Sequence, residues 1–278
     1  MSTQTVCRLL VISVLCPQGA CENRDLELTT GIANAILFFV DGELVGADDD
    51  HSHTGSHGAT RLDARGNFSF PFSATAGEHR LDLLSVSMGM NNWLGVEDNW
   101  KGLLAPNGKL RFVENATGAV QDITHSGWLM QPKLQGERLG LPGGGAAPRP
   151  WEAQSGEVKP LTWLQSEFVT PAGTTALILD AGGLGRGHAY VNGFDIGRFY
   201  LITGTPCSAC GCGGDSCCNK ALCGKPSQRL YHIPPDALKP LGGKNLLTLF
   251  EELGAKDLSA VQVRRFTSAD VPQAVVHA

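Results

Sequence analysis

Six cysteines gather in one short segment and are the strongest chemical signal in the sequence. They follow the spacing C-x2-C-x-C-x4-C-C-x4-C within residues 204–224, where Ile, Val and Phe are absent. A segment with so little apolar surface cannot be ordered by burial alone, so it needs cross-links or a metal ion. Disulfides, a zinc site and free thiols remain alternatives, and the oxidised form is favoured. The cysteines are Cys207, Cys210, Cys212, Cys217, Cys218 and Cys223.

A second segment of metal-binding residue types is DDDHSHTGSH, at positions 48–57. Imidazole and carboxylate groups are common metal ligands. A polar hairpin loop explains the same residues, and loops of this kind vary among sandwich domains. We favour the loop, and we predict no metal site and no cofactor.

Several aromatic residues stand beside amide or guanidinium groups, at the ends of predicted loops. An aromatic ring can cover the apolar face of a sugar while neighbouring donors bind its hydroxyl groups. Packing at the end of a sandwich is the alternative, and it is the commoner use of such residues. The candidate sugar contacts are Asn92, Trp93, Trp100, Arg198 and Tyr200.

The elements that would position these groups are predicted to be strands. Apolar residues alternate with period 2 at 67–72 and 261–263, and short apolar runs elsewhere are bounded by Gly, Asn or Asp. Such runs are typical of strands buried on one or both faces. The 35 Gly and 15 Pro residues fit many short elements joined by turns. The sequence therefore predicts an all-β protein.

The chain also repeats itself. FFVDGELVG at 38–46 matches AYVNGFDIG at 189–197 with an offset of 151, so Val40 and Val191 should be equivalent. Downstream, 77–89 resembles 242–254 with an offset of 165. The cysteine segment lies in the extra length of the second copy. We predict two tandem antiparallel jelly-roll β-sandwich domains, 1–124 and 125–278, the second with linker 142–160 and Cys-rich loop 204–224.

Three stretches outside the matched repeats need an interpretation. Residues 8–16 resemble a weak signal-peptide core, but the repeat predicts a first strand at 8–15, which leaves no convincing targeting signal in view. The strand-like stretch around Trp128 and Leu134 is expected to pack against the second copy. The Pro/Gly-rich linker is expected to be an exposed connection.

Composition limits the partners and the compartment. The net charge is −5 and the sequence has no Lys/Arg-rich block, which argues against a nucleic-acid partner. The sequence contains no run of 18 apolar residues, so it predicts no membrane span. The cysteines and two N-x-[ST] sequons, at Asn67 and Asn115, favour a secretory, extracellular, vacuolar or lysosomal setting.

Four motifs in one order give the chain a family resemblance. LTW (161–163), GGLGRGHAYVNGFDIGRFY (182–200), CGKPSQRLYHIPPDALKP (223–240) and NLLTLFEE (245–252) resemble the C-terminal part of plant-type β-galactosidases of glycoside hydrolase family 35. The first copy resembles the preceding jelly-roll domain. The resemblance implies a comparable cysteine loop involving about Cys207, Cys210, Cys218 and Cys223, with Cys212 and Cys217 additional here.

The same resemblance exposes a difference. Those enzymes act through two glutamates on a (β/α)8 barrel, and neither of the family's glutamate segments occurs in this chain. Glu251 and Glu252 adjoin in a predicted strand and would face opposite ways. Glu97-Asp98 and Asp48-Asp49-Asp50 are interpreted as solvated loop charges. No catalytic residue is predicted.

The sequence thus predicts a non-catalytic, carbohydrate-associated portion of a β-galactosidase-like enzyme, with a catalytic barrel as its partner in cis or in trans. The alternatives are a free-standing lectin-like protein that binds a galactoside-containing glycan and, less favoured, a Cys/His-rich metal-binding protein.

Overall fold

The chain divides into two compact units in the computed structural model, Met1–Leu134 and Gln135–Ala278. Each unit is described separately. The structure describes residues 8–16, 24–29, 35–49, 60–61, 68–75, 77–86, 108–148, 150–153, 157–201, 226, 228–255 and 257–270.

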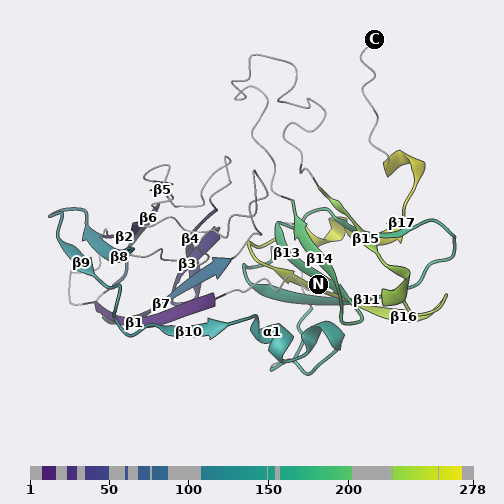
Figure 1. Ribbon diagram of the computed structural model, residues 1–278, viewed down its shortest axis with the longest axis horizontal. Helices are drawn as coiled ribbons and strands as arrows, with labels where there is room; N and C mark the ends of the chain where they lie inside the picture. The colour runs from purple at the N-terminus through teal and green to yellow at the C-terminus, as the bar shows by residue number, and fades with distance from the viewer. Residues whose placement is uncertain are drawn as a thin grey trace, which may run out of the picture. The chain divides into compact units, whose positions relative to one another are not determined.

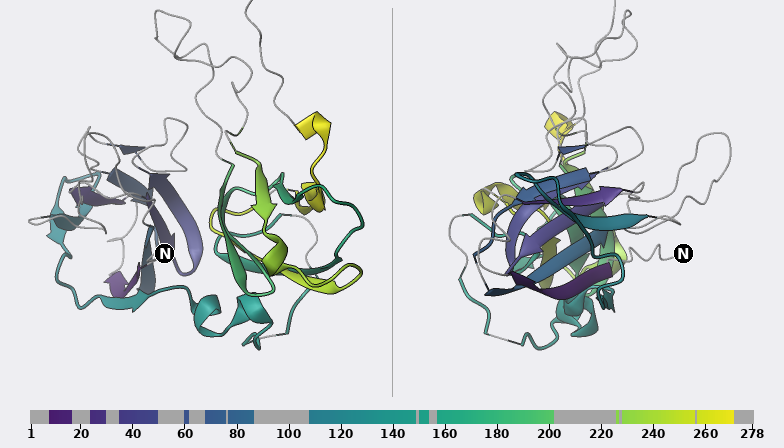
Figure 2. Two further views of the ribbon diagram at one scale, coloured as in Figure 1. Left: turned by 45° about the vertical axis from the view of Figure 1, so that its right-hand side comes forward. Right: turned by 90° about the vertical axis from the view of Figure 1, so that its left-hand side faces the viewer.

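Unit 1 contains two antiparallel sheets of five strands, drawn in purple to teal in Figures 1 and 2. The first sheet, in spatial order, is β10 (Leu129–Pro132), β1 (Arg8–Cys16), β7 (Gly77–Val86), β3 (Ala35–Val40) and β4 (Glu43–Asp49). The second is β5 (Thr60–Arg61), β6 (Phe68–Phe72), β2 (Arg24–Thr29), β8 (Lys109–Glu114) and β9 (Val120–Asp122).

The core of unit 1 lies between these sheets and is strongly aromatic. The period-2 pattern of β6 directs Phe70 and Phe72 into the core, where both rings contact Phe38 with centroids 5.7 Å apart. Phe112 from β8 packs 5.5 Å from Phe72. Edge and tilted contacts of this kind add to the gain from burial.

Unit 2 repeats the two-sheet plan, with seven strands among its described residues (Figure 1). One sheet is β11 (Thr162–Val169), β16 (Lys244–Glu251), β13 (Arg186–Val191) and β14 (Phe194–Tyr200). The other is β15 (Leu230–Ile233), β12 (Leu177–Ala181) and β17 (Val261–Arg265). The short helices are α1 (Gln135–Arg138), η1 (Leu141–Gly143), η4 (Pro235–Ala237), η5 (Leu258–Ala260) and η6 (Ser268–Asp270).

The core of unit 2 is largely aliphatic. Leu177 and Leu179 from one sheet face Val191, Leu247 and Leu249 from the other, and all are at least nine-tenths buried. Because both units bury side chains between two antiparallel sheets, the prediction of an all-β fold with tandem sandwiches is confirmed.

The matched hairpins show how closely the two units correspond. Asp41-Gly42 and Asn192-Gly193 form the turns, with φ of 51° and 85° in both. Positive φ at both positions is what a two-residue hairpin of this twist requires. The register shifts at Phe38/Phe39 in unit 1 and at Ala189/Tyr190 in unit 2, again 151 positions apart.

The downstream match differs by one position from the sequence prediction. Phe38 pairs with Leu83, and Ala189 pairs with Leu249, so equivalent residues of β7 and β16 lie 166 positions apart rather than 165.

The stretch around Trp128 and Leu134 was expected to pack against the second copy, but the structure places it in unit 1. Trp128 packs against the core of unit 1, and β10 pairs with β1. The LMQP stretch of β10 gains backbone partners at an otherwise open strand edge, which decides its position.

Two other expectations also need correction. The linker is not wholly exposed, because Pro142 is buried in η1 and Val158 is 1% exposed and pairs with Ala255. Asp48 and Asp49 were interpreted as loop charges, but the backbone of β4 continues through both. The described part of the chain contains no helix with the length and hydropathy of a membrane span.

Candidate functional site

A buried cluster of charges lies at one end of the four-stranded sheet of unit 2. Arg186 Nε donates to Glu252 Oε2 at 2.7 Å, and Arg198 donates to both carboxylate oxygens at 2.7 and 2.8 Å. The side chains of Arg186 and Glu252 are 2% and 0% exposed, against 19% for Arg198. One carboxylate therefore serves two guanidinium groups, and Arg198 lies within β14 rather than at a loop end.

His188 lies beside this cluster and is 7% exposed. Among the described residues, neither of its ring nitrogens has a hydrogen-bond partner, while its ring stacks on Tyr190 at 6.4 Å between centroids. Burial lowers the pKa of His188, and the nearby charge of Arg198 lowers it further. Both effects favour the neutral form of this imidazole.

The adjoining surface of the same sheet is covered by α1 and η1. Gly136 lies against the indole of Trp163 so closely that a Cβ would be 2.2 Å from the ring. Tyr190 donates its hydroxyl to Glu137 at 2.8 Å, and Gln165 donates to the carbonyl of Leu141 at 2.8 Å. These aromatic residues are therefore used for packing rather than presented to a ligand.

Glu251 points away from Glu252, as expected for neighbours in a strand. Its carboxylate is 0% exposed and accepts backbone N–H groups of Gly185, Arg186 and Leu253 at 3.0 to 3.3 Å. Burial raises the pKa of Glu251 to about 7. Neither glutamate is exposed on a surface where a glycosidic bond could lie between the two.

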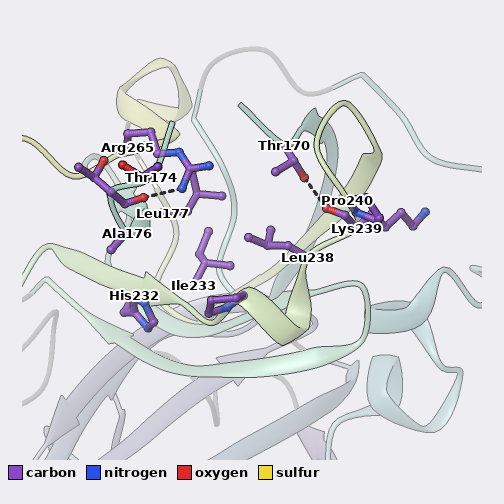
Figure 3. A pocket seen from close by; sticks show the side chains of 12 residues that line it. Thr170, Thr174, Ala176, Leu177, His232, Ile233, Leu238, Lys239, Pro240 and Arg265 are labelled. Atoms are coloured by element: carbon purple, nitrogen blue, oxygen red, sulfur yellow. Dashed lines mark hydrogen bonds between the residues drawn. The ribbon is translucent and has the colours of Figure 1, made fainter. Parts of the chain in front are cut away.

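An open pocket of about 390 Å³ is formed by loops of unit 2 (Figure 3). Its size falls within the usual range for small-molecule sites. Leu177, Ile233 and Leu238 form an apolar floor, and their side chains converge in Figure 3. Around them lie Thr170, Thr174, Thr175, Ala176, His232, Pro235, Lys239, Pro240 and Arg265.

The pocket's loops are fixed by polar contacts. Arg265 donates to the carbonyls of Pro171 and Thr175, which positions the first loop. Thr170 donates its hydroxyl to the Lys239 carbonyl at 2.9 Å and accepts from Asn245 at 2.8 Å, which joins the first loop to the second. The rim is thus pre-formed.

This lining combines apolar side chains with hydroxyl groups and basic residues, and it contains no carboxylate. A sugar offers an apolar ring face and hydroxyl groups, so the lining fits a saccharide. Sequence reasoning missed the pocket because its residues come from three separated segments. The only signal was the Thr-rich, Gly-containing turn at 170–176.

The candidate sugar contacts have different positions. Arg198 is hydrogen-bonded to the carboxylate of Glu252. Tyr200 is partly buried, and its backbone N–H donates to the Tyr231 hydroxyl at 2.7 Å. Asn92, Trp93 and Trp100 lie outside the described residues, as do Glu97 and Asp98. Of the five candidates, the structure therefore places Arg198 and Tyr200 alone.

The other chemical candidates are also largely outside the described ranges. These are all six cysteines of the Cys-rich loop, Asn67 and the histidines of 48–57. Asn115 is described, is exposed in a turn, and donates its amide to Asp25 at 3.1 Å. Within the described ranges, no three His, Cys, Asp or Glu side chains are grouped as metal ligands would be.

Comparison with known proteins agrees with the family resemblance. Residues 161–245 match the sequence model of the beta-galactosidase, galactose-binding domain, family. This part of unit 2 resembles a beta-galactosidase galactose-binding domain. Every residue that lines the pocket of Figure 3, except Arg265, lies within the matched residues 161–245.

The wider chain is similar to plant enzymes. It is 32% identical to Beta-galactosidase 8 of Arabidopsis thaliana over 80% of its length, and 31% identical to Beta-galactosidase 6 of Oryza sativa subsp. japonica over 82%. The sequence-based resemblance to beta-galactosidases is therefore confirmed. The chain spans only 25% and 26% of the length of these two relatives.

Solved structures are more distant. A lectin from Pleurotus ostreatus is 12% identical, with 92% of this chain and 70% of the lectin covered, but the TM-score is 0.28. A score this low does not establish a common fold, so the resemblance to beta-galactosidases depends on the sequence matches.

Proposed function

We propose that the chain is the non-catalytic, carbohydrate-associated portion of a β-galactosidase-like enzyme of glycoside hydrolase family 35, which works beside a catalytic barrel. The observation that supports this most is the burial of Glu251 and Glu252, each 0% exposed. A retaining glycosidase needs two carboxyl groups on either side of the bond, about 5–5.5 Å apart. Here Glu251 accepts backbone N–H groups and Glu252 binds two arginine side chains, so both carboxylates stabilise the sheet instead.

The carbohydrate ligand we propose is a galactoside-containing glycan, bound in the pocket of Figure 3. The family match covers the pocket almost completely. Leu177, Ile233 and Leu238 would contact the apolar face of the sugar ring. The threonine hydroxyls and the pre-formed loop carbonyls would bind its hydroxyl groups.

Isothermal titration of the purified chain with methyl β-galactoside tests this proposal, and Ala176 offers a way to block the pocket. It is exposed and lines the pocket, so Ala176→Phe should fill the space and weaken binding at least tenfold. Ala172 is exposed on the same loop outside the lining, so Ala172→Phe is the matched control and should bind like the parent. If both variants bound methyl β-galactoside with equal affinity, the sugar could not be bound in this pocket.

We further propose a secretory, extracellular, vacuolar or lysosomal setting, with disulfides in the Cys-rich loop and a glycan on Asn115. Asn115 occupies an exposed turn, where a glycan would be tolerated. Mass spectrometry of unreduced peptides from secreted protein should find at least two disulfides among Cys207, Cys210, Cys218 and Cys223, and glycosylation at Asn115. Free thiols at all four cysteines, or bound zinc, would contradict the proposed oxidised loop.

A further inference from the structure

The described parts of the two units share seven strands, and unit 1 has further strands at three sheet edges, β5, β9 and β10. In unit 1, β10 pairs antiparallel with the outer edge of β1. The equivalent strand of unit 2 is β11, since β1 pairs with β7 as β11 pairs with β16. In the described part of the chain, no strand pairs with the other edge of β11. Unpaired edges of this kind are ready acceptors for another strand.

A groove of about 690 Å³ lies beside this edge. Leu247 and Leu249 of β16 and Val263 of β17 form its apolar interior. Its walls include Ser166 of β11 and Trp151, which is 45% exposed. The groove is thus an opening into the core, on the side where the edges of the two sheets approach each other.

In unit 1 the corresponding opening is filled by the segment that leads into β10. Ile123 is 2% exposed in the core, and Trp128 packs against the same core. Backbone contacts hold this segment, because Ile123 donates its N–H to the Leu110 carbonyl at 2.9 Å. The Trp128 indole donates to the Ile123 carbonyl, also at 2.9 Å. An aliphatic and an aromatic side chain therefore close the sandwich beside β1.

We propose that the groove beside β11 accepts an extended peptide strand from another part of a β-galactosidase-type protein. The strand pairs with β11 as β10 pairs with β1, and inserts an aliphatic and an aromatic side chain into the groove. The plant relatives are about four times as long as the matched region, so they contain further polypeptide from which such a strand can come. This inference does not depend on sugar binding.

A synthetic peptide with the sequence of residues 122–134 is a suitable probe, because it carries Ile123, Trp128 and the pairing strand in their native spacing. Binding of the labelled peptide to the full chain is measured by fluorescence anisotropy. Hydrogen exchange then identifies which amides become protected. We expect saturable binding with protection of the amides of 162–169, and a peptide carrying Trp128→Ala should bind at least tenfold more weakly.

Two neighbouring residues of β11 provide matched variants of the chain. Ser166 is exposed and lines the groove, whereas Glu167 is exposed and is absent from the lining. Ser166→Trp should fill the groove and weaken peptide binding at least tenfold, while Glu167→Trp should bind the peptide like the parent.

Three results would overturn the inference. The first is absence of saturable binding, and the second is protection of β1 in place of β11. The third is equal weakening by both tryptophan variants. Analytical ultracentrifugation adds a further test, because a dimer that Ser166→Trp disrupts would place a second copy in the groove instead of a foreign strand.

Discussion

Equivalent positions of the two sandwiches carry opposite kinds of side chain. The register of the strands makes Ala35, Ala47 and Val86 of unit 1 equivalent to Arg186, Arg198 and Glu252 of unit 2. Ala47 and Val86 are buried apolar side chains of unit 1, whereas unit 2 buries a carboxylate between two guanidinium groups at the equivalent positions. The comparison shows that the strand order does not require the charges.

The buried charges instead impose a precise local geometry. A desolvated ion cluster costs free energy to bury, and its attraction offsets this cost only when every group is well placed. Glu252 holds β13, β14 and the end of β16 together through Arg186 and Arg198. Unit 2 is thus fixed by directional contacts at a place where unit 1 is fixed by packing.

The largest expected effect comes from breaking this cluster. Glu252→Val removes the carboxylate that Arg186 and Arg198 bind, and should lower the free energy of unfolding of unit 2 by about 3–5 kcal/mol. Denaturant titration measures the change. Glu167→Gln is the control, because its ion pair with Lys244 is exposed and contributes less than about 1 kcal/mol.

A triple variant sharpens the same comparison. Arg186→Ala, Arg198→Ala and Glu252→Val together install the residues of unit 1, and should recover most of the lost stability, because no buried charge remains. A triple variant as unstable as the single one would show that the apolar set of unit 1 does not fit unit 2.

The hairpin turns give the next effect. Asn192 and Asp41 share one backbone conformation, but the Asn192 amide also donates to the Ala237 carbonyl and to Asn245, both at 2.8 Å. Asn192→Asp removes both donors and should lower the free energy of unfolding by about 1–3 kcal/mol. In unit 1, Asp41→Asn keeps an acceptor for the Arg80 N–H and should cost less, as thermal unfolding of the two variants would reveal.

A smaller effect should appear in the pH dependence of stability. The pKa of His188 is lowered by burial, so the unfolded state binds more protons as the pH falls below about 6.5. His188 should therefore lower the free energy of unfolding of unit 2 toward acid pH, whereas Glu251, whose pKa is raised to about 7, should raise it over the same range. His188→Leu installs the counterpart of Leu37 and should remove the destabilising contribution at acid pH, which denaturant titrations between pH 5 and 7.5 would measure.

His79 of unit 1 should show the opposite sign. Its hydrogen bond with Asp41 raises the pKa of His79, so its contribution to stability is present below about pH 6.5 and is lost as the pH rises through the raised value. His79→Gln should remove this contribution. Equal pH slopes in His188→Leu, His79→Gln and the parent would show that neither histidine controls the response.

Much of the fold could be predicted from the sequence, because it depends on local signals. The Asp41-Gly42 and Asn192-Gly193 turns and the period-2 strands together define the repeat. The site was less predictable. Arg198 and Tyr200 have the residue types of sugar contacts. Only the register of the paired strands reveals that the guanidinium group of Arg198 is already hydrogen-bonded to the carboxylate of Glu252. The pocket of Figure 3 joins residues up to 95 positions apart in sequence, Thr170 and Arg265, which no local pattern reports.

The central claim, a sugar-binding chain without hydrolytic chemistry, can be tested in one sample. Methyl β-galactoside is added to the isotope-labelled chain, and protein and sugar signals are followed together by NMR. We predict saturable shifts of the amides around Thr175, Ala176 and Leu238, with no free galactose released. Release of galactose by the purified chain, or the absence of any shift at these residues, would contradict the account.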